Sequence, residues 1–262
     1  MPENNLGLLM RAARAAGDLA RKFWRQSPKT WEKDGGEGPV SEADLAVNEL
    51  LADLLRSARP DYGWLSEESH DNADRLSREH VFIIDPIDGT RSFLAGDKTW
   101  SHSLAIAQNG EIVTAVVLLP LHDKLYSARH GRGAHLNDVA IHASRRRELN
   151  DATLLAPRHS LDPEHWQGAA PPVTCHFRPS LAYRLAAVAQ GRFDAMLSLR
   201  DTWEWDIAAG TLLAREAGAT VTDRHGAAPA FNNAQPKIAG LLVAGPDLHA
   251  SLIARLSRTG TP

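Results

Sequence analysis

The most informative stretch of this sequence is Val81-Phe82-Ile83-Ile84-Asp85-Pro86-Ile87-Asp88-Gly89-Thr90. Its first four residues form a short β-rich run, which predicts a strand. Asp85 and Asp88 follow directly, and because Pro86 fixes the turn, both carboxylates emerge at the end of that strand. Carboxylate oxygens are hard ligands that suit Mg²⁺ or Ca²⁺, and the main-chain carbonyl of Ile87 offers a further oxygen. The stretch indicates a shared cation, or else a turn in which Asp88 caps a helix.

Hydrophobic spacing predicts the elements around this stretch. Apolar residues at steps of three and four predict a helix from Leu6 to Phe23. Ser41 stands three residues before Asp44, the pattern of a capping box, which predicts the start of a second helix. Asn109-Gly110 lies between two β-rich runs and predicts a hairpin turn. Further strands are predicted at 103–107, 112–119, 124–128, 153–156, 173–177, 193–198, near 220 and at 241–244, and further helices at 180–190, 206–216 and after 246.

The mixture of strands and helices indicates an α/β or α+β fold. The segment from Asn137 to Glu148 is polar and lacks an apolar period, which predicts a connection between subdomains. We place the boundary near Asn150. It divides the chain into an N-terminal α+β subdomain, residues 1–150, which carries most of the candidate ligands, and a C-terminal α/β subdomain, residues 151–262, which completes the site.

Composition excludes several classes of protein. The 262 residues are 43% hydrophobic with a formal net charge of −3, which argues against disorder and against a nucleic-acid polymer as partner. The single cysteine, Cys175, forms no intrachain disulfide. No signal peptide is recognisable, and no apolar run approaches the roughly 20 residues of a membrane helix. We therefore expect a cytoplasmic protein with no membrane partner.

Two more acidic elements stand apart from the first stretch. Glu67-Glu68 follows the short segment Trp64-Leu65-Ser66, and Asp206 stands at the expected start of a helix. Each has an ordinary explanation by itself, because surface solvation accounts for adjacent glutamates and an N-cap accounts for an aspartate at a helix start.

In combination, these elements resemble the inositol monophosphatase superfamily of metal-dependent phosphatases. Asp85-Pro86-Ile87-Asp88-Gly89-Thr90, with Phe93 further on, matches the first signature of that family. Trp205-Asp206-Ile207-Ala208-Ala209-Gly210, with Glu216-Ala217-Gly218, matches the second. Two such motifs in the correct order are highly specific.

Two shorter elements extend the resemblance over most of the chain. Ser66-Glu67-Glu68-Ser69 matches the acidic element of the family, although the family usually has Gly in place of Ser66. Lys33 and Asp44 resemble its N-terminal basic and acidic pair near the metal cluster. The resemblance implies a layered αβαβα sandwich with the site between its two halves, and it implies a homodimer.

The resemblance also implies a metal centre. Glu67, Asp85 and the Ile87 carbonyl would hold one Mg²⁺, and Asp85, Asp88 and Asp206 would hold a second. We expect two or three ions, with Mn²⁺ as a substitute and Li⁺ as an inhibitor. The physical logic is that a phosphate monoester repels an anionic nucleophile, and clustered cations offset that repulsion.

The same resemblance implies roles for the groups around the metals. Asp44 would reach a weaker third ion through water, and Thr90 would orient the attacking water together with Glu67. The amides of Gly89 and Thr90, at a helix start, would bind phosphate oxygens. The predicted catalytic residues are Glu67, Thr90 and Asp44, and the predicted substrate-binding residues are Asp88, Gly89, Thr90 and Asp206.

The substrate within the superfamily is a finer question. Glu204 and Arg91 favour the branch of bacterial 3'(2'),5'-bisphosphate nucleotidases, CysQ-like enzymes that convert 3'-phosphoadenosine 5'-phosphate to AMP. The alternatives are an inositol-1-monophosphatase, a histidinol phosphatase or a fructose-bisphosphate phosphatase. Arg178 and Arg184 either bind a second phosphate or face solvent at a helix start.

Two other classes of protein stay open at this point. A catalytically silent metal-binding regulatory protein would bind Mg²⁺ or Mn²⁺ and release no phosphate. A Ca²⁺-stabilised structural domain would show metal-dependent melting without hydrolysis. Each of the phosphatase hypotheses implies a small phosphorylated metabolite as the partner.

Overall fold

A computed structural model describes residues 4–33 and 38–257, so most of the glycine-rich segment 34–39 lies outside the described residues. Its helices are α1 (Asn5–Phe23), α2 (Glu42–Ala58), α3 (Thr90–Leu94), α4 (Leu181–Ala189), α5 (Glu204–Glu216) and α6 (Pro246–Ile253). Its strands are β1 (Thr30–Glu32), β2 (Pro39–Ser41), β3 (Gly63–Ser66), β4 (His80–Asp88), β5 (Ser101–Gln108), β6 (Glu111–Leu119), β7 (Lys124–Arg129), β8 (Ala134–Leu136), β9 (Val139–Ile141), β10 (Ala152–Leu155), β11 (Val173–His176), β12 (Ala195–Ser198), β13 (Thr202–Trp203), β14 (Thr220–Thr222), β15 (Lys237–Ile238) and β16 (Leu241–Ala244).

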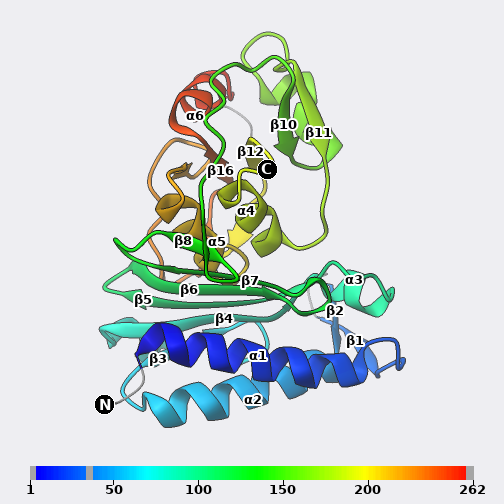
Figure 1. Cartoon of the computed structure of the whole chain (residues 1–262), viewed down its shortest axis with the longest axis vertical. Helices are drawn as coiled ribbons and strands as arrows, with labels where there is room; N and C mark the ends of the chain where they lie inside the picture. The colour runs from blue at the N-terminus through cyan, green and yellow to red at the C-terminus, as the bar shows by residue number, and fades with distance from the viewer. Residues whose placement is uncertain (1–3, 34–37, 258–262) are drawn as a thin grey trace.

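Two large sheets alternate with helices in five layers (Figure 1). The first sheet has seven strands in the order β3-β4-β5-β6-β7-β8-β9, with β3 parallel to β4 and the other pairs antiparallel. The second has five strands in the order β11-β10-β12-β16-β14. Helices α1 and α2 cover the outer face of the first sheet, α4 and α5 lie between the sheets, and α6 covers the far face of the second. The expected αβαβα sandwich is therefore present.

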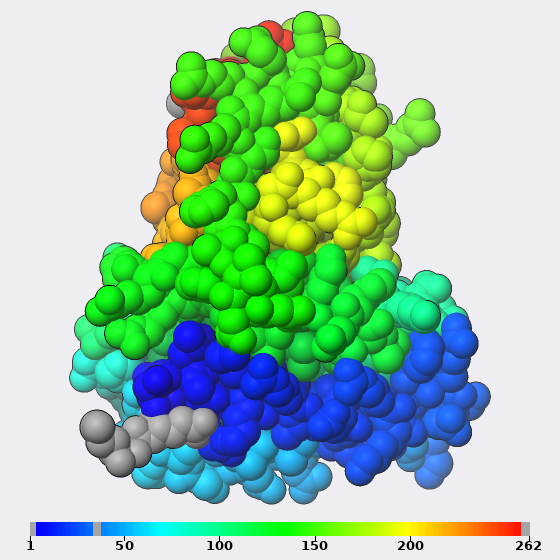
Figure 2. Space-filling view, in the orientation of Figure 1, coloured from blue at the N-terminus to red at the C-terminus, as the bar shows by residue number. Residues whose placement is uncertain are grey.

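The space-filling view shows the same order from base to top (Figure 2). The blue and cyan helices form a wide base below the green strands, and the narrower upper part carries the yellow to red C-terminal residues. The two sheets also divide the sequence, since the first uses residues 63–141 and the second uses residues 152–244. The subdomain boundary near Asn150 remains a proposal that agrees with this division.

Local signals in the sequence explain where elements begin and turn. Ser41 Oγ accepts from the Ala43 amide, and the Asp44 carboxylate accepts from the Ser41 amide at 2.9 Å, so the capping box starts α2 as predicted. Asn109 and Gly110 both have positive φ, at 51° and 85°, as the predicted tight hairpin turn requires.

Two predictions about the strands need correction. Strand β4 does not end before the aspartates but continues to Asp88, and its pairing with β5 shifts register between Asp85 and Asp88. The acidic motif therefore lies on an irregular strand end, where the shift re-aims its side chains. The polar segment from Asn137 to Glu148 is not entirely a connection, because β9 pairs with β8 inside it.

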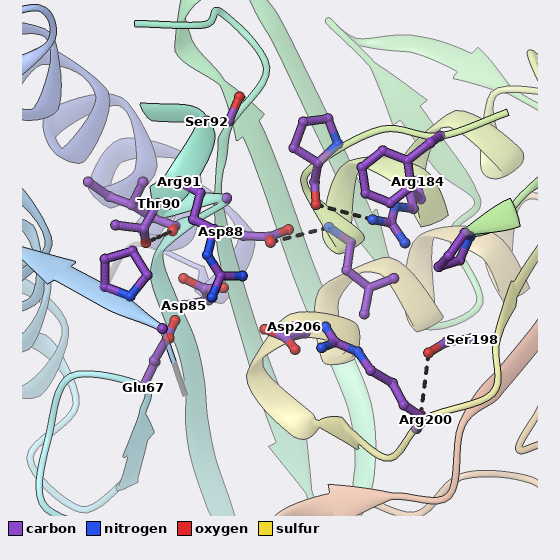
Figure 3. A pocket seen from close by; sticks show the side chains of 18 of the residues that line it. Glu67, Asp85, Asp88, Thr90, Arg91, Ser92, Arg184, Ser198, Arg200 and Asp206 are labelled. Carbon is purple, nitrogen blue, oxygen red and sulfur yellow. Dashed lines mark hydrogen bonds between the residues drawn. The ribbon is translucent and has the colours of Figure 1, made fainter. Parts of the chain in front are cut away.

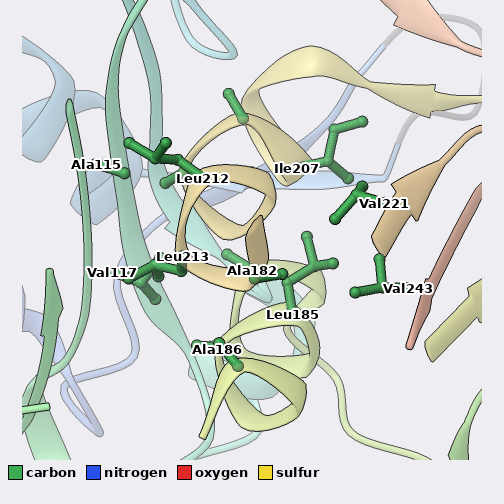
Figure 4. Close-up of a cluster of buried hydrophobic side chains, with 14 of the residues drawn as sticks. Ala115, Val117, Ala182, Leu185, Ala186, Ile207, Leu212, Leu213, Val221 and Val243 are labelled. Atoms are coloured by element: carbon green, nitrogen blue, oxygen red, sulfur yellow. The ribbon is translucent and has the colours of Figure 1, made fainter. Parts of the chain in front are cut away.

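The middle helix layer is packed against both sheets (Figure 4). Ala115 and Val117 of β6 face Leu212 and Leu213 of α5, and residues of α4 fill the space toward the second sheet. Gly210 lies where the two helices are in close contact, since a Cβ there would lie 2.4 Å from Leu185 Cβ. The small residues of the second motif therefore let α5 pack directly on α4.

No helix in the described ranges is both long and apolar enough to cross a membrane.

We predict that Gly210→Ala lowers the free energy of unfolding by about 1–3 kcal/mol, because the added methyl overpacks the contact with Leu185. Urea denaturation measures the change. In a Leu185→Ala background the same substitution should cost less, since space opens at the contact. Equal costs in both backgrounds would contradict this packing.

Candidate active site

Three acidic side chains from separate parts of the sequence meet at one point. Glu67 directly follows β3, Asp85 lies in β4 and Asp206 lies in the first turn of α5. One carboxylate oxygen from each lies within 4.8 Å of the other two. Parallel pairing of Ser66 with Ile84 places Glu67 beside Asp85, and the packing of α5 against β4 and β5 brings Asp206 to them.

These carboxylates line a cavity of about 460 Å³ between the two halves of the molecule (Figure 3). Its wall includes seven of the eight predicted site residues, six of which are Glu67, Asp85, Asp88, Gly89, Thr90 and Asp206. Ile87 also lines it, whereas Asp44 does not.

The electrostatics of the cluster require a positive partner. Asp85 is 1% exposed, and its Oδ1 is buried without a hydrogen-bond partner. Burial raises the pKa values of Asp85 and Asp206 well above the usual range, and neighbouring carboxylates raise them further. A buried acidic group of this kind is unfavourable unless a cation compensates it. Several carboxylate oxygens around one point are the donor set that Mg²⁺ prefers, so the residues present fit the expected ion.

Lys33 supplies part of the compensation. Its Nζ contacts Glu67 Oε1 and Glu68 Oε1, each at 2.7 Å. Burial disfavours the Lys33 charge, but the two glutamates outweigh it and raise the pKa of the ammonium group. Burial, with the Glu67 charge, raises the pKa of Glu68 to about 7. Glu68 therefore holds Lys33, whereas Glu67 is shared between Lys33 and the carboxylate cluster.

Asp44 and Thr90 form a separate hydrogen-bonded unit. The buried carboxylate of Asp44 accepts from Ser41 through its capping box and from Thr90 Oγ1 at 3.0 Å. The Ile87 carbonyl oxygen lies 3.1 Å from the same Thr90 hydroxyl. Asp44 therefore fixes the orientation of Thr90 and lies outside the three-carboxylate cluster.

Asp88 also lies outside that cluster. Its carboxylate accepts from Ser180 Oγ at 2.6 Å and from the amides of Leu181 and Ala182 at 3.2 and 2.7 Å. These groups belong to the first turn of α4, so Asp88 caps a helix far from it in sequence. Burial raises the pKa of Asp88 to about 6, and the bonds to Ser180 and α4 oppose the rise.

One sequence interpretation fails on this geometry, and a residue used to choose a branch of the family lies away from the cavity. Asp206 is not an N-cap, because the N-cap of α5 is Trp203 and Asp206 stands inside the first turn. Glu204 does not face the substrate cavity, because it is fully buried and accepts from the amides of Asn232 and Asn233 at 2.6 and 2.9 Å. Its presence before the second motif therefore says nothing about substrate contacts.

His102 of β5 is a residue that sequence reasoning missed. It is fully buried, and its Nδ1 bonds to the carbonyl oxygen of Pro86, between the two aspartates of the motif. Burial lowers the pKa of His102 to about 4, so the ring is neutral at pH 7. No local pattern marks this histidine, since strand pairing alone brings it to the turn.

The fold and the site together define a metal-dependent phosphatase. A family model described as "Inositol monophosphatase family" matches residues 2–260, and the chain belongs to this family. The catalytically silent and purely structural alternatives are accordingly set aside.

Individual relatives extend over nearly the whole chain. An inositol-1-monophosphatase of Rhizobium meliloti (strain 1021) is 36% identical over 251 residues, which cover 92% of this chain and 91% of the relative. Nus factor SuhB of Xylella fastidiosa (strain Temecula1) is 32% identical over 257 residues, which cover 92% and 90%. Neither name is that of a nucleotidase, so these relatives do not support the CysQ-like branch.

A solved structure confirms the fold. An IMPase from Thermotoga maritima superposes with a TM-score of 0.82 at 27% identity, and the match covers 96% of each chain.

We predict that the buried, neutral His102 makes stability depend on pH. Between its ordinary pKa of 6.5 and its folded value of about 4, the unfolded chain binds a proton that the folded chain does not. The stability that the neutral His102 ring contributes to the folded state is therefore complete above pH 6.5 and is lost as the pH falls from 6.5 toward about 4. From pH 7 to pH 5 the free energy of unfolding should fall by about 2 kcal/mol more in the wild type than in His102→Asn. Parallel urea titrations at both pH values check this, and equal falls would exclude a neutral buried imidazole.

Proposed function

We propose that this chain hydrolyses phosphate monoesters of inositol, with inositol 1-phosphate as the reference substrate and Mg²⁺ as the cofactor. The observation that carries the proposal is the meeting of Glu67, Asp85 and Asp206 in one cavity, where a buried Asp85 oxygen lacks a partner. The choice of inositol is supported by the name of the Rhizobium relative.

In this proposal the carboxylates divide the metal sites as the family resemblance implies. Glu67, Asp85 and the Ile87 carbonyl would hold one ion, and Asp88 and Asp206, with Asp85, would hold a second. Ions bound there would offset the charge of the phosphate and lower the pKa of a water molecule. Since Asp88 Oδ1 already accepts from the Leu181 amide and Oδ2 from the Ala182 amide, Asp88 would bind an ion while remaining anchored to α4.

Thr90 and Glu67 would orient the attacking water. Because Thr90 Oγ1 donates its proton to Asp44, its oxygen is left to accept a hydrogen bond from that water. The amides of Gly89 and Thr90 would bind phosphate oxygens at the edge of the cavity, where both residues are found. Asp44 would act as a positioning residue for Thr90 and as a water-mediated neighbour of a weaker third ion.

A 3'(2'),5'-bisphosphate nucleotidase is the second candidate. Arg91 and Arg184 both line the cavity, which favours a substrate with more than one phosphate. Histidinol phosphate and fructose 1,6-bisphosphate stay in the panel of esters to be tested. The proposal also includes Mn²⁺ as a substitute, inhibition by Li⁺, a homodimer and a cytoplasmic location.

We predict that inositol 1-phosphate is hydrolysed in the presence of Mg²⁺ and that EDTA abolishes the release of phosphate. Steady-state kcat/KM values for inositol 1-phosphate, histidinol phosphate, fructose 1,6-bisphosphate and 3'-phosphoadenosine 5'-phosphate rank the candidates. A preference of about tenfold corresponds to 1.4 kcal/mol of transition-state discrimination. A ranking with histidinol phosphate or fructose 1,6-bisphosphate first would exclude inositol as the substrate class.

We predict that Asp206→Asn lowers Mg²⁺-dependent kcat/KM by at least about a hundredfold, since it removes a charged oxygen from the cluster. Phosphate release measures the loss, and circular dichroism checks that the fold persists. Asp201→Asn is the matched control, because Asp201 is exposed and lies outside the cavity. Near-normal turnover in folded Asp206→Asn would contradict the assignment of Asp206 as a metal ligand.

A further inference from the structure

The cavity that holds the carboxylate cluster also has a basic side. Arg184 lies in the first turn of α4, and Arg200 follows β12; both line the cavity. In Figure 3 both lie across the pocket from Glu67, and Asp206 lies between Glu67 and Arg200. The acidic and basic sides therefore face the same space.

Arg184 is buried and makes no direct ion pair with any described residue, although the charges of Asp88 and Asp206 act on it at longer range and oppose the fall in its pKa. Its residue is 8% exposed, its Nε donates to the carbonyl of Arg178, and its Nη2 lies 3.3 Å from the carbonyl of Pro179. The guanidinium carbon lies 4.3 Å from the centre of the Phe177 ring, and Nη1 makes no hydrogen bond to any described residue. Burial lowers the pKa of the guanidinium to about 10. Carbonyls and an aromatic face orient this cation but do not neutralise it.

Arg200 is exposed and likewise makes no ion pair within the described ranges of the chain. It is close enough to Asp206 for its charge to oppose the rise in pKa that burial causes there. The two arginines thus come from different elements, α4 and the loop after β12, and neither is paired with a carboxylate.

We propose that Arg184 and Arg200 bind a second anionic group of the substrate, separate from the phosphate ester that is hydrolysed. This inference rests on the proposed function, in which the ester phosphate lies at the carboxylate cluster. An ester whose remaining part is neutral would leave both guanidinium groups without a directly bound anion, whereas the second phosphate of a bisphosphate would pair with them. An inositol bisphosphate and an adenosine bisphosphate share this chemistry.

Matched pairs of substrates test the proposal and separate the two sources. The pairs are inositol 1-phosphate with inositol 1,4-bisphosphate, and adenosine 3'-phosphate with adenosine 3',5'-bisphosphate. We expect the doubly phosphorylated member of at least one pair to have a kcat/KM about tenfold higher or more. In Arg200→Gln and in Arg184→Gln that preference should disappear, because the KM for the bisphosphate rises about tenfold more than the KM for the monophosphate.

Arg200→Gln is the decisive variant if Arg184→Gln fails to fold, because Arg200 is exposed. Arg145→Gln is the control, since Arg145 is exposed and lies outside this cavity; it should keep the preference. Equal kcat/KM within both pairs, or an equal loss for both members in Arg200→Gln, would overturn the proposal. If the wild type hydrolyses none of these esters, the proposed function is refuted. Calorimetric measurement of their binding then tests the basic side by itself. Tighter binding of a bisphosphate than of its monophosphate, lost in Arg200→Gln, would still support the basic side.

Discussion

The central constraint on this structure is that three carboxylates, which repel one another, are held together at the junction of the two sheets. Glu67, Asp85 and Asp206 present oxygens within 4.8 Å of one another, with Lys33 as a direct cationic contact of Glu67. Buried carboxylates this close together repel one another, so the cluster needs a compensating cation. Asp85 and Asp206 lie on β4 and α5, which pack against each other and so keep the two side chains together.

The helix layer between the sheets determines the shape of the site. α5 carries Asp206, and α4 both anchors Asp88 through its first turn and carries Arg184. Because Gly210 lets the two helices touch, the positions of these three side chains depend on one close contact. The acidic side and the basic side of the cavity are therefore linked through the same pair of helices.

Hydrophobic periodicity and turn chemistry predicted most elements, including the helix that begins at Ser41 and the hairpin at Asn109-Gly110, because these signals are local. The two acidic motifs predicted that Asp85 and Asp206 belong to one site. The sequence could not reveal that Ser180 binds Asp88 across 92 positions. Such contacts depend on tertiary packing, which periodicity does not encode.

The same limit applies to two side chains whose surroundings the sequence could not predict. Glu204 occurs in a motif, but its buried carboxylate binds the 232–233 loop, and only the packed structure distinguishes that role from a substrate contact. Arg184 is the reverse case, since a helix-start arginine that solvation would explain lies buried at the cavity wall.

Anomalous diffraction from crystals soaked in Mn²⁺ tests the central claim most directly. The account predicts a strong peak within about 2.5 Å of carboxylate oxygens from Glu67, Asp85 and Asp206, because these hard ligands share one cation. A well-ordered site with no peak there, at Mn²⁺ concentrations that saturate activity, would contradict it.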